Sequence, residues 1–403
     1  MRTVDAAGLP IGDGHPPRIV GVLNLSPESP YDPSVFADPG RAATYVDEEL
    51  VAEGADIVDV GLESANKRFS VLSAEEELDR LDAAIEVLES VSGDVVFSIE
   101  TRYHEVADAA LAGGFDMVND ICGFADPEMP AVCAEYDAAV VKMASPPDLT
   151  RPGAIESVDG IYAALERGDL TEKTIVDPAF GGWSAGKTTA VDRETFERLG
   201  EFRGLDRPIL VSINRKNFLK EIAGRSTDEA LPTSLAATAM AVSRGVHAIR
   251  THDVAATRDA ALVGAAFTRD RASIVNESVT IEELDAATPR EVGRYRDRIG
   301  ADADSEDAVT RVFELRGLLA ADRGTLAELA RTNGATVAAG APGTDRDGID
   351  RTSTGDTDDE GTASALLIGS VAAFRRVAAA IENDRDGTER LGAVAEAVRA
   401  AIE

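Results

Sequence analysis

The sequence predicts an α/β protein whose main part is a (β/α)8 barrel of the TIM type, followed by a smaller, mainly α-helical C-terminal region. Three observations favour this architecture. Short runs rich in Val and Ile recur eight times, segments with helical periodicity separate them, and each run is nearly continuously apolar rather than alternating. Strands that are apolar on both faces are typical of a parallel sheet covered by helices, and eight repeats in about 250 residues match the size of such a barrel. We therefore divide the chain into an N-terminal segment 1–17, a barrel 18–272 and a C-terminal extension 273–403.

The barrel is predicted from strands and helices that alternate along the chain. The strands are Arg18–Asn24, Asp56–Val60, Val95–Glu100, Phe115–Asn119, Ala139–Met143, Thr174–Asp177, Ile209–Ile213 and Val246–Arg250. Helical periodicity lies between them, as in Arg41–Glu53, Ala74–Val91, His104–Ala112, Arg193–Phe202 and Leu235–Arg244. The alternative is an open, doubly wound sheet, which more often has five to seven strands and a Gly-rich first turn. The first strand is followed by no GxGxxG motif, so the barrel is favoured.

The C-terminal extension has a different pattern from the barrel. Amphipathic helices are predicted over 282–299, 306–333, 366–381 and 389–402, with a short strand at 336–339. Residues 340–364 are rich in Gly, Asp and Thr and are predicted to form a flexible loop. The extension contains no recognisable metal, nucleotide or nucleophile motif, so the sequence assigns it no role.

Composition excludes several classes of function. The 403 residues include 73 Asp and Glu against 40 Lys and Arg, for a net charge of −33, so the surface cannot neutralise a run of nucleic-acid phosphates. Among the basic residues, arginine far outnumbers lysine. This resembles proteins of salt-loving organisms, because in molar salt the Debye length is only about 3 Å and self-repulsion is screened. An ordinary acidic cytosolic protein is the alternative. Two cysteines make no disulfide framework, and no apolar stretch is long enough for a signal or membrane helix, so we expect a cytoplasmic protein with no membrane partner.

Polar side chains lie at or just beyond the carboxyl end of nearly every predicted strand, which is the end where barrel enzymes carry out their chemistry. They are Asn24, Glu63, Glu100, Asn119, Lys142, Asp177, Lys216, Arg250 and His252. A polar group directly on an apolar strand must be paired or bound, since leaving it unsatisfied costs about 1–3 kcal/mol. The mixture of carboxylates and amides suits an N–H-rich heterocycle, and the Lys, Arg and His set suits an anion.

At these strand ends the sequence resembles dihydropteroate synthase, the pterin-binding barrel enzyme of folate biosynthesis, over residues 18 to about 270. The matching segments are Gly21–Ser29, Glu53–Ser64, Ser98–Thr101, Val118–Ile121, Val176–Pro178, Asn214–Lys216 and Ile249–Val254. Each segment alone is a weak signal, whereas seven in the right order are specific. The resemblance implies a transferase that joins a dihydropterin hydroxymethyl diphosphate to p-aminobenzoate, or a related arylamine, and releases pyrophosphate.

The resemblance also implies a role for each matching residue. Asn24 would bind Mg²⁺ and the diphosphate, which Arg250 and His252 would grip from the last strand. The pterin would be read by Glu100, Asn119, Asp177 and Lys216, and Lys216 would also face the arylamine. Asn24, Lys216, Arg250 and His252 form the implied catalytic set. Because the family usually forms dimers through outer barrel helices, a homodimer is expected as well.

Some positions depart from the family pattern. The Thr-Arg pair that the family carries after Glu63-Ser64 is replaced by Ala65-Asn66, and Lys67-Arg68 follows. Asn214 stands for a serine, and Glu100 stands for a shorter aspartate. Positions for the arylamine are therefore less well kept than those for the pterin. Two alternatives stay open: a pterin-dependent methyltransferase, which has no use for an anion grip, and a non-catalytic pterin-binding paralogue.

Several other patterns have simpler explanations than a functional site. Residues 181–188 match the GxxxxGK[ST] phosphate loop, but Pro178 and an extra turn separate them from the strand, so an NTP site is the less favoured interpretation. His104 and His247 are predicted to be structural, and Cys122 and Cys133 to be small core residues. Asp59 is predicted to be a buried hydrogen-bond acceptor in the barrel, with Glu63 bracing the site, rather than an acid–base pair with it.

Overall fold

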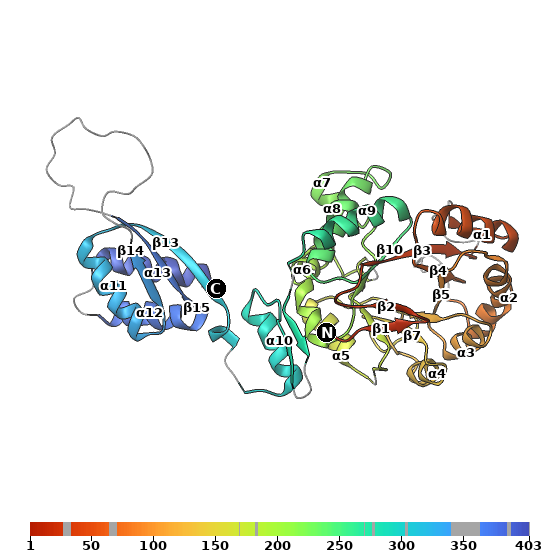
Figure 1. Ribbon diagram of the computed structural model, residues 1–403, viewed down its shortest axis with the longest axis horizontal. Helices are drawn as coiled ribbons and strands as arrows, with labels where there is room; N and C mark the ends of the chain where they lie inside the picture. The colour runs from red at the N-terminus through yellow and green to blue at the C-terminus, as the bar shows by residue number, and fades with distance from the viewer. Residues whose placement is uncertain are drawn as a thin grey trace. The chain divides into compact units, whose positions relative to one another are not determined.

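The computed structural model describes residues 1–26, 34–63, 71–168, 170–181, 184–269, 271–275, 279–302, 305–339, 363–384 and 388–402. Its contacts divide the chain into two compact units, Met1–Glu283 and Leu284–Glu403. Each unit has its own hydrophobic core. Figure 1 shows the helices and strands of both units.

Eight parallel strands form the centre of the first unit. They are β3 (Arg18–Asn24), β4 (Ile57–Gly61), β5 (Val96–Thr101), β6 (Met117–Asp120), β7 (Ala139–Met143), β8 (Thr174–Asp177), β9 (Leu210–Val211) and β10 (Ala248–Thr251). Neighbouring strands pair in the order β8-β7-β6-β5-β4-β3-β10-β9, and a parallel bridge between Val176 and Ile209 joins the two ends of this series. The predicted (β/α)8 barrel is confirmed.

Helices surround the barrel and alternate with its strands (Figure 1). They are α1 (Pro39–Tyr45), the π-helix η2 (Val46–Val51), α2 (Ala74–Ser90), α3 (His104–Ala112), α4 (Met129–Glu135), α5 (Val158–Glu166), α6 (Thr189–Glu197), the 3-10 helix η3 (Leu199–Leu205), α7 (Asn217–Ala223), α8 (Leu231–Ser243) and α9 (Val254–Ala266). Local sequence explains where they begin. In α2, for example, Ser73 and Glu76 form a reciprocal capping box.

The N-terminal segment packs against the base of the barrel. Strands β1 (Val4–Ala6) and β2 (Leu9–Ile11) form an antiparallel hairpin, and its side chains Val4, Ala6 and Ile11 are almost fully buried. They share one apolar cluster with Val20, Ile57, Val96, Met117, Ala139, Val141, Ile175, Leu210 and Ala248, most of which lie early in their strands. The amino end of the barrel interior is therefore filled with packed apolar side chains.

The second unit is built on a small antiparallel sheet with helices. After the two-stranded pair β11 (Ser273–Val275) and β12 (Thr280–Glu282) of the first unit come α10 (Pro289–Ile299), the short turn η4 (Ser305–Asp307), β13 (Thr310–Leu318), α11 (Ala320–Thr332), β14 (Thr336–Ala339), β15 (Ala363–Ser370), α12 (Val371–Asn383) and α13 (Glu389–Ile402). The sheet order is β13-β15-β14. Helices α10 to α13 make the described part of this region mainly α-helical, as predicted.

Three predicted helices of the C-terminal extension are wrong in their first parts. The helix predicted over 282–299 begins only at Pro289, because Glu282 lies in β12 and Thr288 caps the helix. The helix predicted over 306–333 contains strand β13, whose side chains alternate between exposed and partly buried with a period of two, and the helix begins only at Ala320. The helix predicted over 366–381 begins at Val371, because Leu366–Ser370 lies in the central strand β15 and Ser370 caps the helix. Residues 340–362 of the predicted flexible loop lie outside the described residues.

None of the helices in the described part of the chain combines the length and apolar composition needed to cross a bilayer.

Candidate active site

Arg250, at the end of β10, lies at the centre of a network of charged side chains at the carboxyl end of the barrel. Its Nε donates to Asp59 Oδ2 at 2.7 Å, and its Nη2 donates to Glu100 Oε2 at 2.6 Å. Asn119 Nδ2 donates to the same Asp59 oxygen at 2.9 Å. Strands β4, β5, β6 and β10 thus each contribute one side chain to a single network; Glu100, Asn119 and Arg250 belong to the predicted strand-end set, whereas Asp59 does not.

Burial makes this network electrostatically strong. It raises the pKa of Glu100, and the Asp59 carboxylate adds to that effect against the opposing charge of Arg250. Burial alone would lower the pKa of Arg250, but the carboxylates of Glu100 and Asp59 outweigh it and raise that pKa. The guanidinium therefore stays charged at any pH in which the protein is folded, and it holds two carboxylates that would otherwise repel each other.

Asn24 at the end of β3 is oriented by a buried hydrogen bond, in which its Nδ2 donates to Ser34 Oγ at 2.8 Å. Its Oδ1 therefore faces the neighbouring strand, where a Cβ built on Gly61 would lie 3.3 Å from Asn24 Oδ1 and 4.0 Å from Glu100 Oε1. Glycine at position 61 keeps this space beside the amide oxygen free of a side chain. The space is bordered by hard oxygen atoms, which are the donors that Mg²⁺ prefers, so the residues present fit such an ion.

Asp177, the last residue of β8, and Lys216, which follows β9 and caps α7, influence each other electrostatically. Asp177 Oδ1 accepts the backbone N–H of Ala179 at 2.7 Å, and Ala179 has a left-handed backbone with φ of 60°. Burial raises the pKa of Asp177, while Lys216, Lys187 and Arg250 oppose this. Burial lowers the pKa of Lys216, and Asp177 opposes that shift in turn. Each group stabilises the charged form of the other in a site shielded from water.

The chain beyond β10 is tied to the segment that carries Lys216. Asp253 accepts two hydrogen bonds from Arg215, at 3.0 and 2.8 Å, and one from Asn214 Nδ2 at 2.9 Å. Arg215 has a left-handed backbone with φ of 51°, a strained conformation of the kind found at functional sites. Burial and the nearby Arg250 lower the pKa of His252 to about 3, so its ring is neutral at neutral pH.

The structure brings most of the predicted site residues to one end of the barrel. Glu100 is bonded directly to Arg250, and Asn119 is linked to Arg250 through Asp59. The charge of Arg250 also affects the pKa values of Asp177, Lys216 and His252.

The prediction for Lys142 as a member of this rim is wrong. Its Nζ donates to the backbone oxygens of Leu165, at 3.1 Å, and Arg167, so it binds the last carbonyls of α5 on the outside of the barrel.

Two residues make more contacts at the rim than their sequence pattern indicated. Asp59 was predicted only as a buried acceptor, yet it joins β6 to β10 through Asn119 and Arg250, and its Oδ1 is buried with no hydrogen-bond partner among the described residues. Its position in the middle of a strand, three residues from the carboxylate of Asp56, gave no sign of this. Arg215 was noted only as part of a motif, and its bond to Asp253 depends on a contact across 38 residues.

Lys187, in the segment that matches a phosphate loop, does not face a phosphate site. Its Nζ donates to the backbone oxygens of Gly153, at 3.4 Å, and Ala179. Burial lowers its pKa to about 8. Because its amino group donates to protein carbonyls, this lysine agrees with an NTP site being the less favoured interpretation. Residues 182 and 183 lie outside the described part.

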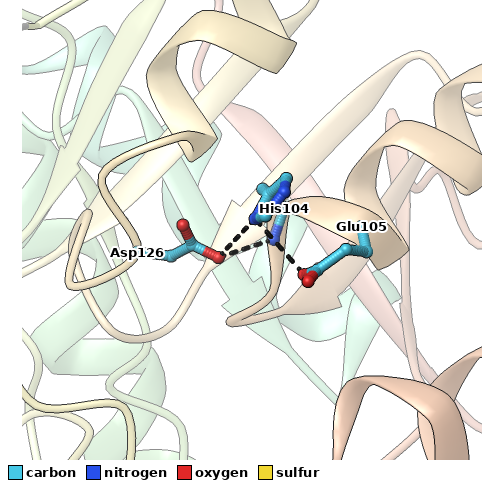
Figure 2. Close-up of side chains that lie close together, drawn as sticks. All are labelled: His104, Glu105 and Asp126. Atoms are coloured by element: carbon cyan, nitrogen blue, oxygen red, sulfur yellow. Dashed lines mark hydrogen bonds and ion pairs between the residues drawn. The ribbon is translucent and has the colours of Figure 1, made fainter.

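A second cluster lies at the start of α3, where His104, Glu105 and Asp126 place one ligand atom each within 4.8 Å of the others (Figure 2). Asp126 Oδ2 accepts the backbone N–H of His104 at 3.0 Å and contacts His104 Nδ1 at 2.8 Å. That hydrogen bond and the nearby carboxylates raise the pKa of His104. Asp126 thereby caps the helix, and an ion pair with His104 accounts for the ring without a bound metal.

The family model described as pterin binding enzyme matches residues 20–252, more than half of the chain. The chain belongs to the family of pterin-binding enzymes. The match begins in β3 and ends two residues after Arg250, so it spans every strand that contributes to the site.

The relatives of this pterin-binding enzyme include synthases of two kinds. It is 36% identical over 254 residues to a probable bifunctional folylpolyglutamate synthase/dihydropteroate synthase of Halobacterium salinarum, and the match covers 60% of this chain but only 30% of that relative. It is 32% identical over 249 residues to the dihydropteroate synthase of Streptococcus pyogenes serotype M3, covering 60% of this chain and 92% of the relative. The chain thus corresponds to less than a third of the bifunctional relative.

Solved structures agree with these matches. Dihydropteroate synthase from Thermus thermophilus, in complex with 4-aminobenzoate, is 34% identical with a TM-score of 0.55, and the match covers 66% of this chain and 100% of that one. The Xanthomonas albilineans enzyme in complex with 7,8-dihydropteroate is 29% identical with a TM-score of 0.52, covering 66% and 98%. The resemblance to dihydropteroate synthase is confirmed, and these relatives favour neither the methyltransferase nor the non-catalytic alternative.

Proposed function

We propose that this pterin-binding enzyme condenses a dihydropterin hydroxymethyl diphosphate with p-aminobenzoate, or a related arylamine, and releases pyrophosphate in folate biosynthesis. The observation that carries the proposal is the network at the rim, in which one partly buried guanidinium, that of Arg250, binds Asp59 and Glu100 beside Asn119. Acceptors of this kind suit the N–H-rich edge of a pterin, and the adjacent cation suits its diphosphate.

The pterin is held by hydrogen bonds from several strand ends. Asp177 and Glu100 accept from ring and amino N–H groups, and Asn119 both donates and accepts. Lys216 donates to the carbonyl side of the ring and faces the arylamine. The raised pKa values of Glu100 and Asp177 indicate carboxylates in a shielded site, where a hydrogen bond to a ligand is strong.

The diphosphate is held by Arg250, His252 and Asn24. Arg250 uses Nε and Nη2 for carboxylates, which leaves Nη1 to donate to a phosphate oxygen. Asn24 would hold Mg²⁺ through Oδ1, and the ion would neutralise negative charge on the diphosphate when bound. His252, neutral in the free protein, donates one N–H to the anion.

The reaction is a displacement at the exocyclic CH₂ of the pterin. The arylamine nitrogen forms the new C–N bond with its lone pair as the C–O bond to the diphosphate breaks, pyrophosphate leaves with that electron pair, and the nitrogen loses a proton. Positive charge on the CH₂ is shared with the pterin ring, and negative charge accumulates on the leaving group beside Arg250. Catalysis is positioning and charge stabilisation, with no covalent enzyme intermediate.

Pyrophosphate release tests this function. The protein, in molar KCl with Mg²⁺, is incubated with dihydropterin hydroxymethyl diphosphate with and without p-aminobenzoate. Release that needs the amine supports the proposal, whereas pterin binding without turnover supports the non-catalytic paralogue. Activity that requires KCl would also support the cytoplasmic, high-salt setting that the composition predicts.

We propose a homodimer through the outer helices α7, α8 and α9. Exposed apolar side chains gather on these helices and just beyond them: Ile222, Met240, Leu262, Val263 and Phe267, the last 87% exposed. Large exposed apolar side chains close together often mark an interface. Light scattering in molar KCl should give twice the chain mass, and Phe267→Glu with Val263→Glu should give the mass of one chain.

A further inference from the structure

Arg102 is a buried arginine to which the proposed reaction assigns no step. It follows β5 directly, two residues after Glu100, and its side chain is only 1% exposed. Removing a guanidinium from water costs several kcal/mol unless close partners compensate. The partners of Arg102 therefore indicate what its burial achieves.

The guanidinium joins three of the connections at the rim. Its Nη2 donates to Glu63 Oε2 at 2.6 Å, just after β4, and its Nη1 donates to the backbone oxygen of Leu149 at 2.6 Å, in the connection after β7. Cys122 Sγ, after β6, contacts the same Leu149 oxygen at 3.4 Å. Arg102 thus links the ends of β4, β5 and β7 from one point.

Glu63, the partner of Arg102, and the two residues on either side of Arg102 are also hydrogen-bonded to this region. Glu63 Oε1 accepts the N–H of Leu72 at 3.2 Å, and Tyr103 Oη donates to the Leu72 oxygen at 2.6 Å. Thr101 Oγ1 donates to Glu77 on α2 at 2.6 Å. Three consecutive residues after Glu100 are therefore each bonded to α2 or to the connections around it.

Side-chain alternation along β5 separates Glu100 from its neighbour Thr101. Along a strand, successive side chains point to opposite faces. Thr101 points outward to Glu77, whereas Glu100 points inward to Arg250. A shift of the backbone at residues 101–103 would move the Glu100 carboxylate relative to Arg250 by a similar distance.

We propose that Arg102 is a positioning residue for Glu100: by binding Glu63 and the Leu149 carbonyl it fixes the end of β5, so that Glu100 meets Arg250 and the pterin in one geometry. The inference rests on the proposed function. In this proposal Arg102 contacts neither the pterin nor the diphosphate, and it sets the affinity for the pterin through Glu100.

The test compares Arg102→Met and Arg102→Lys with a matched control, Arg198→Met. Arg198 is also a shielded arginine, 13% exposed and paired with Glu194, Glu201 and Asp159, but it lies after α6 on the outside of the barrel. Pterin binding is measured by calorimetry, kinetic constants by pyrophosphate release, and stability by thermal unfolding.

Arg102→Met should weaken binding of the dihydropterin diphosphate about 10- to 100-fold and raise its KM more than it lowers kcat, since misplacement by about 1 Å has effects of that size. Arg102→Lys, which keeps the charge and one bond, should recover part of the affinity. Arg198→Met should lower stability and leave pterin affinity unchanged. Equal affinity in Arg102→Met and wild type would overturn the proposal.

A double-mutant cycle keeps the proposal testable if Arg102→Met fails to fold. Glu63→Gln alone should weaken pterin binding, and Arg102→Lys with Glu63→Gln should lose little more than either change does singly, because both act through one contact. Fully additive losses would show that Arg102 does not act through Glu63. Failure of the proposed function is distinguishable, because wild type would then release no pyrophosphate although the binding comparison still stands.

Discussion

The two ends of the barrel are made from the same eight strands, yet they treat buried polar groups in opposite ways. At the base, Asp13 accepts hydrogen bonds from Arg203 at 3.1 and 2.8 Å and from Arg271 at 3.1 Å, and it contacts His247 Nε2 at 3.2 Å. At the rim, Asp59 keeps one buried oxygen without a hydrogen-bond partner among the described residues.

From this difference we infer that the base serves stability and that the rim serves binding. The Asp13 carboxylate at the base is paired with Arg203, Arg271 and His247. At the rim, buried charges are paired only in part, and the unused hydrogen-bonding capacity costs stability until a ligand takes it up. Four substitutions or titrations test this contrast.

The largest effect is expected at the rim, from Arg250→Ala. Pyrophosphate release should fall about 100- to 1000-fold, the usual loss when one group that stabilises developing negative charge is removed. Calorimetry with free pterin and with the pterin diphosphate separates the causes, because the diphosphate ligand should lose much more affinity. Equal losses for both ligands would contradict the diphosphate role of Arg250.

At the base, Asp13→Asn should reduce stability and leave catalysis intact. Burial alone would raise the pKa of Asp13, but His247 and Arg203 outweigh it and hold that pKa well below its usual range. Since the folded protein favours the ionised form, this stabilisation is complete above about pH 4 and disappears as the pH falls further. Urea unfolding at pH 7 should show a loss of about 3 kcal/mol.

The control for this prediction is Asp307→Asn, which removes an exposed carboxylate in the second unit that is paired with Arg376 at 3.2 Å. It should change stability much less than Asp13→Asn does, because an exposed ion pair contributes little. A change in KM for either substrate in Asp13→Asn would show that the two ends of the barrel are not independent.

Glu77 beside the rim should make stability depend on pH in the opposite direction. Burial raises its pKa to about 7, although the bond from Thr101 opposes this. The folded protein then binds a proton that the unfolded chain has released, so stability falls as pH rises from about 4.5 to 7. The free energy of unfolding should change less between pH 5 and 7.5 in Glu77→Gln than in wild type, by about 2 kcal/mol. Urea unfolding at the two pH values measures this difference. An unchanged slope would mean that Glu77 is ionised in the folded state.

The smallest effect concerns His252. With a pKa of about 3, set by burial and by Arg250, its ring should show no NMR titration between pH 5 and 8. His104, whose pKa is raised by Asp126, should titrate above the ordinary value of a histidine in the same spectra. His252→Gln assigns the signal, and a midpoint near 6.5 for His252 would refute the prediction.

Sequence pattern was sufficient for the barrel because its strands are apolar on both faces and alternate with segments of helical periodicity. Strands β3, β7 and β8 have the predicted bounds. The same pattern failed for Lys142, because a strand-end position does not say whether a long side chain turns inward or reaches outward to a helix end.

The second unit was harder to predict because short local periodicity is ambiguous there. Leu366–Ser370 reads equally well as the start of an amphipathic helix, and pairing with β13 and β14, far away in sequence, decides for a strand. Arg102 was missed, and the full role of Asp59 was not predicted, for a similar reason. Their roles depend on contacts across 39 and 60 or more residues, which no local motif encodes.

The way the barrel closes has a consequence for its motions. Between β8 and β9 the ring is joined by the bridge from Val176 to Ile209 and by the bond from the Val176 N–H to the Pro208 oxygen at 2.9 Å, whereas β3 and β4 pair over five residues. This narrow junction lies between the strand that ends at Asp177 and the strand that Lys216 follows. Local opening should therefore begin there, so the amide of Val176 should exchange with deuterium faster than those of β4, and a bound pterin spanning both strands should slow it.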